Sequence, residues 1–218
     1  MTDQLEWVGK TALDYFALKN AARERALPKS RAAIRFCANS IRATHRLEFE
    51  SARQLMAQAA TLLQEMERDL REHQDIFFAG FVHDAQKEYA EAMTFVAIVQ
   101  DAPLPSAEEL GIGWAAYLNG LAEAVGELRR YVLDQLRRGN TLSCEHFLGV
   151  MDDIYALLIT VDFPDAITGG LRRTTDATRG ILEKTRGDLT TAIGQAQLQQ
   201  SLQVLQQSLE QASQQNKR

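Results

Sequence analysis

The stretch YLNGLAEAVGEL, residues 117–128, decides the fold class of this chain. Its large apolar side chains recur at intervals of three or four residues: Tyr117, Leu121, Val125 and Leu128. This interval is typical of an α-helix with one buried face, whereas a half-buried strand would alternate at every second residue. The pattern predicts a helix over residues 112–138, closed by the stop signal Gly139-Asn140.

The same spacing continues in both directions along almost the whole chain. The strong helix formers Ala, Leu, Gln, Glu and Arg are abundant, and the 218 residues include only 13 glycines and 4 prolines. The sequence therefore predicts an all-α protein, a bundle of seven helices with a long second helix and an extended C-terminal helix. The expected helices cover residues 3–25, 29–72, 75–99, a short piece that begins at a Ser106 cap, 112–138 and 143–160, and a final helix that has Pro164 near its start and continues through Leu171 to about Leu209.

Prolines and turn residues mark the expected boundaries. Pro28 is expected to separate the first two helices, because a proline inside a helix removes a hydrogen bond and clashes with the preceding turn. Two prolines within residues 101–105 interrupt the pattern again. The tetrapeptide DFPD, residues 162–165, is expected to form a turn before the last helix, and Ser143 is expected to cap the sixth.

The C-terminal region has a different composition from the rest of the chain. From Gln195 onward Gln, Leu and Ser dominate, and four leucines follow the 4-3-4 spacing of a short coiled-coil seam. They are Leu198, Leu202, Leu205 and Leu209. A frayed, solvated tail is the alternative interpretation. We therefore divide the chain into a helical domain, residues 1–194, and a Gln-rich extension, residues 195–218.

Charge and composition exclude several classes of protein. A formal net charge of −5 argues against a protein that coats nucleic acid through bulk positive charge, so any such contact must use a local patch. Cys37 and Cys144 show no CxxC spacing, and we expect two reduced core thiols. The apolar stretches at residues 92–99 and 155–161 are too short to span a bilayer and no leader is visible, so we expect a cytoplasmic protein.

A group of basic residues in the expected second helix falls within one arc at about 100° of rotation per residue. The group consists of Arg31, Arg35, Arg42, Arg46 and Arg53, with His45 beside them. The planar fork of arginine binds phosphate at two points, so this face could follow a nucleic-acid backbone. The alternative is a solvated face on which Glu48 and Glu50 pair with the arginines.

Two pairs of glutamates form a second candidate site. Glu88 and Glu91 stand three residues apart and share one helix face, and Glu123 and Glu127 stand four apart and share another. Alanines and glycines around both pairs would let the two helices approach closely.

Four carboxylates that meet in a confined site repel one another, and Mg²⁺ or Mn²⁺ would neutralise them. Metals held in this way activate water and stabilise charge on a phosphodiester, as in many nucleases. Acid pairs at this spacing are also common on solvated helix surfaces, which is the alternative. A di-iron site would need Glu-x-x-His pairs, which these two helices lack.

Several stretches of the chain resemble landmarks of the translin/TRAX family of RNA-processing proteins, and they occur in the family's order. They are SIRATHR at 40–46, EYAEA at 88–92, YLNGLAE at 117–123 followed by GEL at 126–128, and DFPDA at 162–166. The region from GLRR at 170–173 to KTRGDL at 184–189 resembles the family's last helix. The resemblance covers about residues 5–190.

The resemblance implies a seven-helix α fold, closed oligomers (hexamers or octamers) with an internal cavity, and binding of single-stranded RNA or DNA. In the catalytic branch, typified by TRAX, a carboxylate cluster supports metal-dependent endoribonuclease activity, and the translin branch lacks this acidic set. The motif positions fall here on Glu88, Glu91, Glu123 and Glu127. Two features depart from the family: Glu123 stands where the catalytic branch has Asp, and the region after about Gly194 has no counterpart.

The sequence therefore leads to the hypothesis of a homo-oligomeric endoribonuclease that depends on Mg²⁺ or Mn²⁺ and encloses single-stranded RNA. The four glutamates would be the catalytic metal ligands, and the basic face would hold phosphates. A protein that binds single-stranded RNA or DNA without cutting it is the first alternative. A structural oligomer whose coiled-coil tail recruits a partner is the second.

Overall fold

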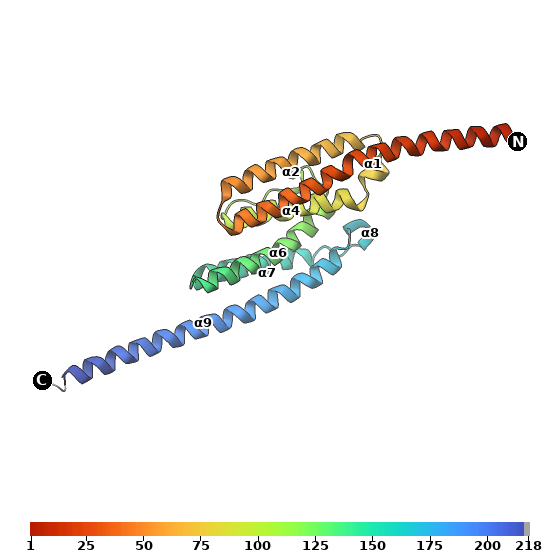
Figure 1. Ribbon diagram of the computed structural model, residues 1–218. Coiled ribbons are helices and arrows are strands. Elements are labelled where there is room, and N and C mark those ends of the chain that lie inside the picture. Colours follow the sequence, from red (N-terminus) through yellow and green to blue (C-terminus); the bar gives the residue numbers. More distant parts are fainter. Residues whose placement is uncertain (216–218) are drawn as a thin grey trace.

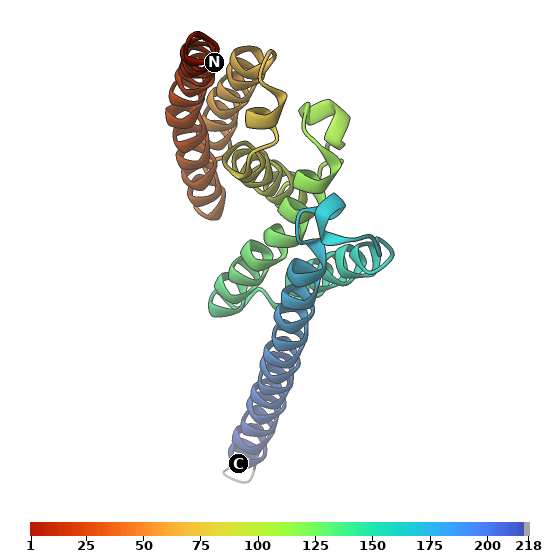
Figure 2. The same ribbon diagram turned by 90° about the vertical axis from the view of Figure 1, so that its right-hand side faces the viewer.

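The computed structural model describes residues 1–215, which form nine α-helices and contain no β-strand (Figure 1). The predicted all-α fold is confirmed. The helices are α1 (Thr2–His45), α2 (Phe49–Leu70), α3 (Gln74–Phe77), α4 (Gly80–Val99), α5 (Ala107–Leu110), α6 (Trp114–Arg137), α7 (Thr141–Leu158), α8 (Asp165–Thr168) and α9 (Leu171–Gln215). Helices α1, α2 and α4 pack together in one half of the molecule and α6, α7 and α9 in the other, and the contact between α4 and α6 joins the halves (Figures 1 and 2).

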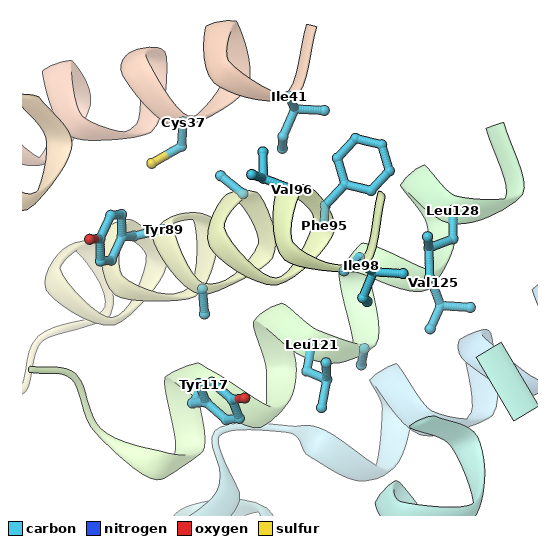
Figure 3. Packing of buried hydrophobic residues seen from close by; sticks show 14 of the residues in the cluster. Cys37, Ile41, Tyr89, Phe95, Val96, Ile98, Tyr117, Leu121, Val125 and Leu128 are labelled. Atoms are coloured by element: carbon cyan, nitrogen blue, oxygen red, sulfur yellow. The ribbon is translucent and has the colours of Figure 1, made fainter. Parts of the chain in front are cut away.

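The hydrophobic core passes through α4, which lies between α1 and α6 (Figure 3). Phe95 of α4 is fully buried near the centre of this core. Side chains of α1 and α6 complete the packing around α4: Cys37, Ile41, Leu121, Val125 and Leu128. Both cysteines, Cys37 and Cys144, are buried free thiols, as the sequence predicts.

The predicted boundary at Pro28 is wrong, because α1 runs through this proline for 44 residues. The first helix is therefore long, and the predicted long second helix over residues 29–72 is wrong, because these residues are divided between α1 and α2. Tertiary contacts of the two residues that follow the proline offset the hydrogen bond that it removes. The Ser30 hydroxyl donates to the carbonyl of Phe81 in α4 at 2.7 Å, and the Lys29 ammonium pairs with Glu65 and Asp69 of α2 at 2.8 Å each.

The chain turns from α1 to α2 at residues 46–48, where the sequence contains neither glycine nor proline. Leu47 adopts a left-handed conformation with φ of 62°. The Glu48 N–H donates to the carbonyl of Ala43 at 2.9 Å, which closes the end of α1 as a left-handed residue usually does. Arg46 binds both carboxylate oxygens of Glu48 at 2.8 Å and completes the turn.

Two further boundaries differ from the predictions. The expected helix over residues 75–99 is divided into α3 and α4, because the backbone at Ala79 is extended. Ser143 lies inside α7 and donates to the carbonyl of Asn140, which is the actual cap residue.

Other predicted boundaries are confirmed. Ser106 caps α5 and forms a reciprocal capping box with Glu109. Pro164 precedes a helix, as predicted, but this is the short helix α8; the left-handed pair Gly169 and Gly170 separates it from α9, so the expected final helix is divided.

The first turns of α1 and the last turns of α9 project from the two ends of the bundle (Figures 1 and 2). Leucines 198, 202, 205 and 209 are helical, and each is between 50% and 61% exposed. The helix passes residue 194 without a break, and residues 216–218 of the predicted extension lie outside the described part of the chain. None of the described helices combines the length and the apolar character that a bilayer crossing requires.

Helices α4 and α6 approach each other closely at Gly120. A β-carbon at this position would lie 2.4 Å from the Lys87 carbonyl oxygen, 2.6 Å from the Ala90 β-carbon and 2.9 Å from the Glu91 nitrogen. No side chain fits into such distances, so this position requires glycine. A β-carbon at Gly126, six residues further along α6, would meet only the Ile181 δ-carbon at 4.0 Å.

We expect Gly120→Ala to destabilise the protein by about 1 to 3 kcal/mol, because the added methyl forces α4 and α6 apart. In a chain of this size each kcal/mol corresponds to a decrease in melting temperature of about 2 to 4 °C. Gly126→Ala is the matched control on the same helix, and it should leave stability unchanged or raise it by up to about 1 kcal/mol. Thermal unfolding followed by circular dichroism measures both, and equal melting temperatures for the two variants would contradict the close contact.

Candidate metal centre

The contact at Gly120 brings the two glutamate pairs to the same side of the α4–α6 interface. Glu88 and Glu91 come from α4, and Glu123 comes from the turn of α6 that follows Gly120. One carboxylate oxygen from each of these three residues lies within 4.8 Å of the others. The sequence prediction that the two helices bring carboxylates together is therefore correct for three of the four residues.

Burial and mutual repulsion disfavour the charged form of these acids. Glu91 is only 9% exposed, and burial, followed by the charges of Glu88, Glu123 and Glu127, raises its pKa to about 8. Burial is also the first cause that raises the pKa of Glu88, and the charge of Glu123 is the second. A divalent cation would remove this repulsion, and an all-oxygen carboxylate set is what Mg²⁺ and Mn²⁺ prefer. The donor set thus fits such an ion.

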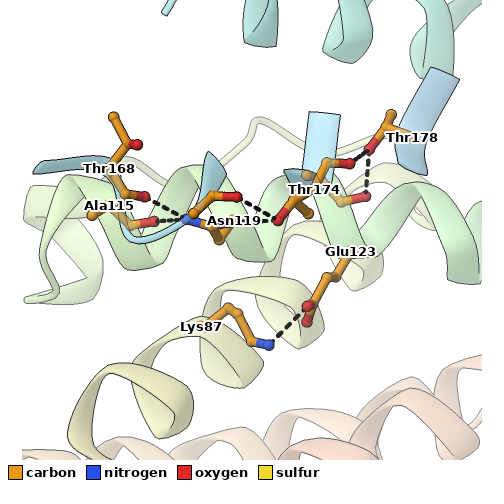
Figure 4. Close-up of polar contacts among 9 residues, drawn as sticks. Lys87, Ala115, Asn119, Glu123, Thr168, Thr174 and Thr178 are labelled. Atoms are coloured by element: carbon orange, nitrogen blue, oxygen red, sulfur yellow. Dashed lines mark hydrogen bonds and ion pairs between the residues drawn. The ribbon is translucent and has the colours of Figure 1, made fainter. Parts of the chain in front are cut away.

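Lys87 supplies the positive charge nearest to this group (Figure 4). Its ammonium lies 2.7 Å from an oxygen of Glu123. Burial by itself would lower the pKa of Lys87, but the hydrogen bond to Glu123 and the charges of neighbouring acids outweigh it, and the pKa is raised. Lys87 was not among the residues predicted from the sequence, although its position directly before Glu88 was a visible signal.

Glu127 does not belong to the group of three carboxylates. Its carboxylate accepts a hydrogen bond from Nε2 of His45 at 2.5 Å and lies 3.8 Å from Arg130. The His45 side chain is 6% exposed and packs beside the rings of Phe95 and Tyr131. Its Nδ1 atom is buried and has no hydrogen-bond partner in the described part of the chain. His45, which the sequence placed beside the basic face, is therefore buried and holds Glu127.

The predicted basic face is divided between two helices, because α1 ends at His45 and Arg53 belongs to α2. Arg46 and Arg53 pair with Glu48 and Glu50, as the alternative interpretation expected. Arg31, Arg35 and Arg42 are exposed on α1, and none of them pairs with a carboxylate within residues 1–215. These three remain the accessible part of the predicted phosphate-binding face.

Asn119, one helical turn before Glu123, fixes α6 against α8 and α9 (Figure 4). Its amide donates to the carbonyls of Ala115 and Thr168, each at 2.8 Å, and its side-chain oxygen accepts from the Thr174 hydroxyl at 2.8 Å. Because Asn119 is buried and fully bonded, the wall of the site beside Glu123 is held in place. A buried asparagine cannot be distinguished from an exposed one in sequence, and this role was not foreseen.

Known proteins resemble the chain over most of its length. No family model matches it. It is 33% identical over 204 residues to the uncharacterized protein MJ0175 of Methanocaldococcus jannaschii, a match that covers 91% of this chain and 89% of the relative.

Among solved structures, the chain is similar to AfC3PO, with a TM-score of 0.75 and 36% identity over 87% of this chain and 96% of that one. The structure of AfC3PO in complex with duplex RNA gives a TM-score of 0.74 and 35% identity over the same shares of the two chains. The crystal structure of apo-NeC3PO, at 19% identity and a TM-score of 0.75 over 85% of this chain and 96% of that one, shows the shared fold alone.

AfC3PO and NeC3PO are proteins of the translin/TRAX type. The alignments with MJ0175 and AfC3PO cover at least 87% of this chain. The chain also shares its all-α architecture with both C3PO structures. The chain therefore belongs to the translin/TRAX family.

Proposed function

We propose that this protein is an Mg²⁺- or Mn²⁺-dependent endoribonuclease that binds RNA inside a closed homo-oligomer. The observation that carries the proposal is the group formed by Glu88, Glu91 and Glu123, whose carboxylate oxygens lie within 4.8 Å of one another. The similarity to AfC3PO, which has been solved in complex with duplex RNA, supports RNA as the ligand. The family resemblance favours single-stranded RNA as the substrate.

The three glutamates would hold the divalent cation, which would activate water and neutralise charge on the phosphodiester. Glu127 has a different task, since His45 fixes its carboxylate beside the group. In this position it can bind the ion through water or accept a proton from the attacking water. Water adds across a P–O bond, so one product carries the phosphate and the other a hydroxyl.

Exposed arginines of α1 are the best candidates for contacts with phosphates. Arg31, Arg35 and Arg42 form no pair with a carboxylate among the described residues, so RNA need not displace an acid from them. With a net charge of −5, most of the surface repels RNA. Useful affinity therefore needs a confined region where these side chains from several subunits converge.

Exposed apolar residues support the assembly of several chains. The first turns of α1 expose Leu5, Trp7, Leu13 and Phe16, each by at least 65%. Patches of this kind mark contact surfaces in soluble proteins. A hexamer or an octamer would enclose the site, and light scattering measures the subunit number.

A protein that binds RNA or single-stranded DNA without cutting it is the second candidate. The ion pair between Lys87 and Glu123 favours it, because the ammonium already partly neutralises the carboxylates without a metal ion. Labelled single-stranded and duplex RNA, incubated with Mg²⁺, Mn²⁺ or EDTA, distinguish the two candidates. Cleavage that EDTA abolishes supports the nuclease, and binding without cleavage in any condition supports the second candidate.

We expect Glu91→Gln to reduce RNA cleavage about 100-fold or more, the scale of losing one electrostatic contact to a transition state, and to leave RNA binding within about twofold. The substitution keeps the shape of the side chain but removes a charged ligand from the ion. Glu50→Gln, on the surface, is the matched control and should cleave like the wild type. Wild-type cleavage rates for Glu91→Gln would contradict the assignment of this site.

We expect Lys87→Met to increase the stabilisation that Mn²⁺ provides. Without the ammonium, the carboxylates of the metal-free protein repel one another more strongly, and the ion removes a larger penalty. Mn²⁺ should then raise the melting temperature by about 2 to 4 °C more than in the wild type, which corresponds to about 1 kcal/mol. Lys29→Met breaks a distant pair with Glu65 and Asp69 and should leave the effect of Mn²⁺ unchanged. An equal response to Mn²⁺ in both variants would argue against an ion at this position.

We expect the triple substitution of Arg31, Arg35 and Arg42 by Ala to weaken RNA binding to a similar extent for all sequences. Each lost phosphate contact should reduce the slope of log affinity against log salt by about 0.7 for a single strand, or about 2 in total. Arg179→Ala, which removes an exposed arginine paired with Glu183, is the control. A salt dependence that equals that of the control would assign the three arginines to another role.

A further inference from the structure

A pocket of about 440 Å³ lies between α6 and the start of α9, and Glu123 of the carboxylate group forms part of its wall. The other side of the wall consists of Gly169, Gly170 and the first three turns of α9. The volume is within the range of small-molecule sites and is sufficient for one nucleotide. Its wall combines two segments that are distant in the sequence, residues 122–123 and 169–181, so no local pattern predicts it.

Two charged residues line this pocket, Glu123 and Arg173. They do not form an ion pair with each other, and Arg173 pairs with no carboxylate in the described part of the chain. Its neighbour Arg172 is also exposed but does not line the pocket. Arg173 is thus a cation without a counter-ion, at a pocket that also contains a member of the carboxylate group.

The rest of the wall is small and firmly held. Gly169 and Gly170 have φ values of +63° and +86°, and a β-carbon at Gly170 would meet nothing within 4 Å. Asn119 ties both ends of this turn to α6, through the Thr168 carbonyl and the Thr174 hydroxyl (Figure 4). The pocket therefore exists without a ligand and does not need to be formed by one.

We propose that this pocket binds the nucleotide next to the bond that is cut, and that Arg173 binds a phosphate of that nucleotide. The inference rests on the proposed function and assigns its substrate-binding site. A ligand that spans the pocket must present two groups. One must bind a cation held by Glu123, and the other must be an anion that binds Arg173. Two successive phosphates of an RNA backbone satisfy both conditions, and the guanidinium fork suits phosphate geometry.

The test compares Arg173→Ala with its matched control Arg172→Ala in the full-length protein. With a short labelled single-stranded RNA, Arg173→Ala should raise KM about tenfold, and Arg172→Ala should stay within about twofold of the wild type. In a Glu91→Gln background, Arg173→Ala should also reduce the salt slope of binding by about 0.7. The stabilisation by Mn²⁺ should be unchanged, which shows that the metal centre is intact.

A second variant changes the shape of the pocket and leaves its charge alone. Ala177 lines the pocket from an exposed position on α9, so Ala177→Leu should fill it without disturbing the core. We expect the same increase in KM as for Arg173→Ala. Wild-type KM values for both variants, with RNA still bound and cut, would overturn the assignment of this pocket and leave the proposed function standing. If the wild type neither binds nor cuts RNA, the proposed function itself fails.

Discussion

The contact between Gly120 and the backbone of α4 is the constraint on which the rest of this structure depends. It joins the two halves of the bundle, and it sets the separation of the helices that carry Glu91 and Glu123. A larger residue would separate the helices and, with them, the carboxylates. The same contact between α4 and α6 therefore sets both the stability of the fold and the geometry of the carboxylate site.

The site itself is a balance of charges in a partly buried environment. Three carboxylates gather beside one ammonium, and a histidine and an arginine hold the fourth carboxylate, Glu127. Burial makes each uncompensated charge costly, so the positions of Lys87 and His45 matter as much as those of the acids. Residues that control the charge of a site, such as Lys87 and His45, can thus be of a different type from the acids that would hold the metal ion.

The sequence predicted the helical class and the meeting of three of the four acids, because both depend on spacing along a helix. It could not place the turn after α1, because Leu47 adopts a left-handed conformation that leucine does not favour. Pro28 misled for the opposite reason: a strong local signal was overridden by tertiary contacts of Lys29 and Ser30. The burial of His45 and the pocket beside Arg173 depend on contacts between distant segments, and no periodic pattern encodes them.

Helix α9 joins two environments in a single continuous element. Leu171, Leu182 and Leu189 are buried in the bundle, whereas every residue from 194 to 211 is exposed. The backbone amides of the two parts should therefore exchange hydrogen with solvent at very different rates in a single chain, since an isolated helix frays readily. Slow exchange in the second part would reveal that another surface covers it, and the residue at which protection ends would locate the edge of that surface.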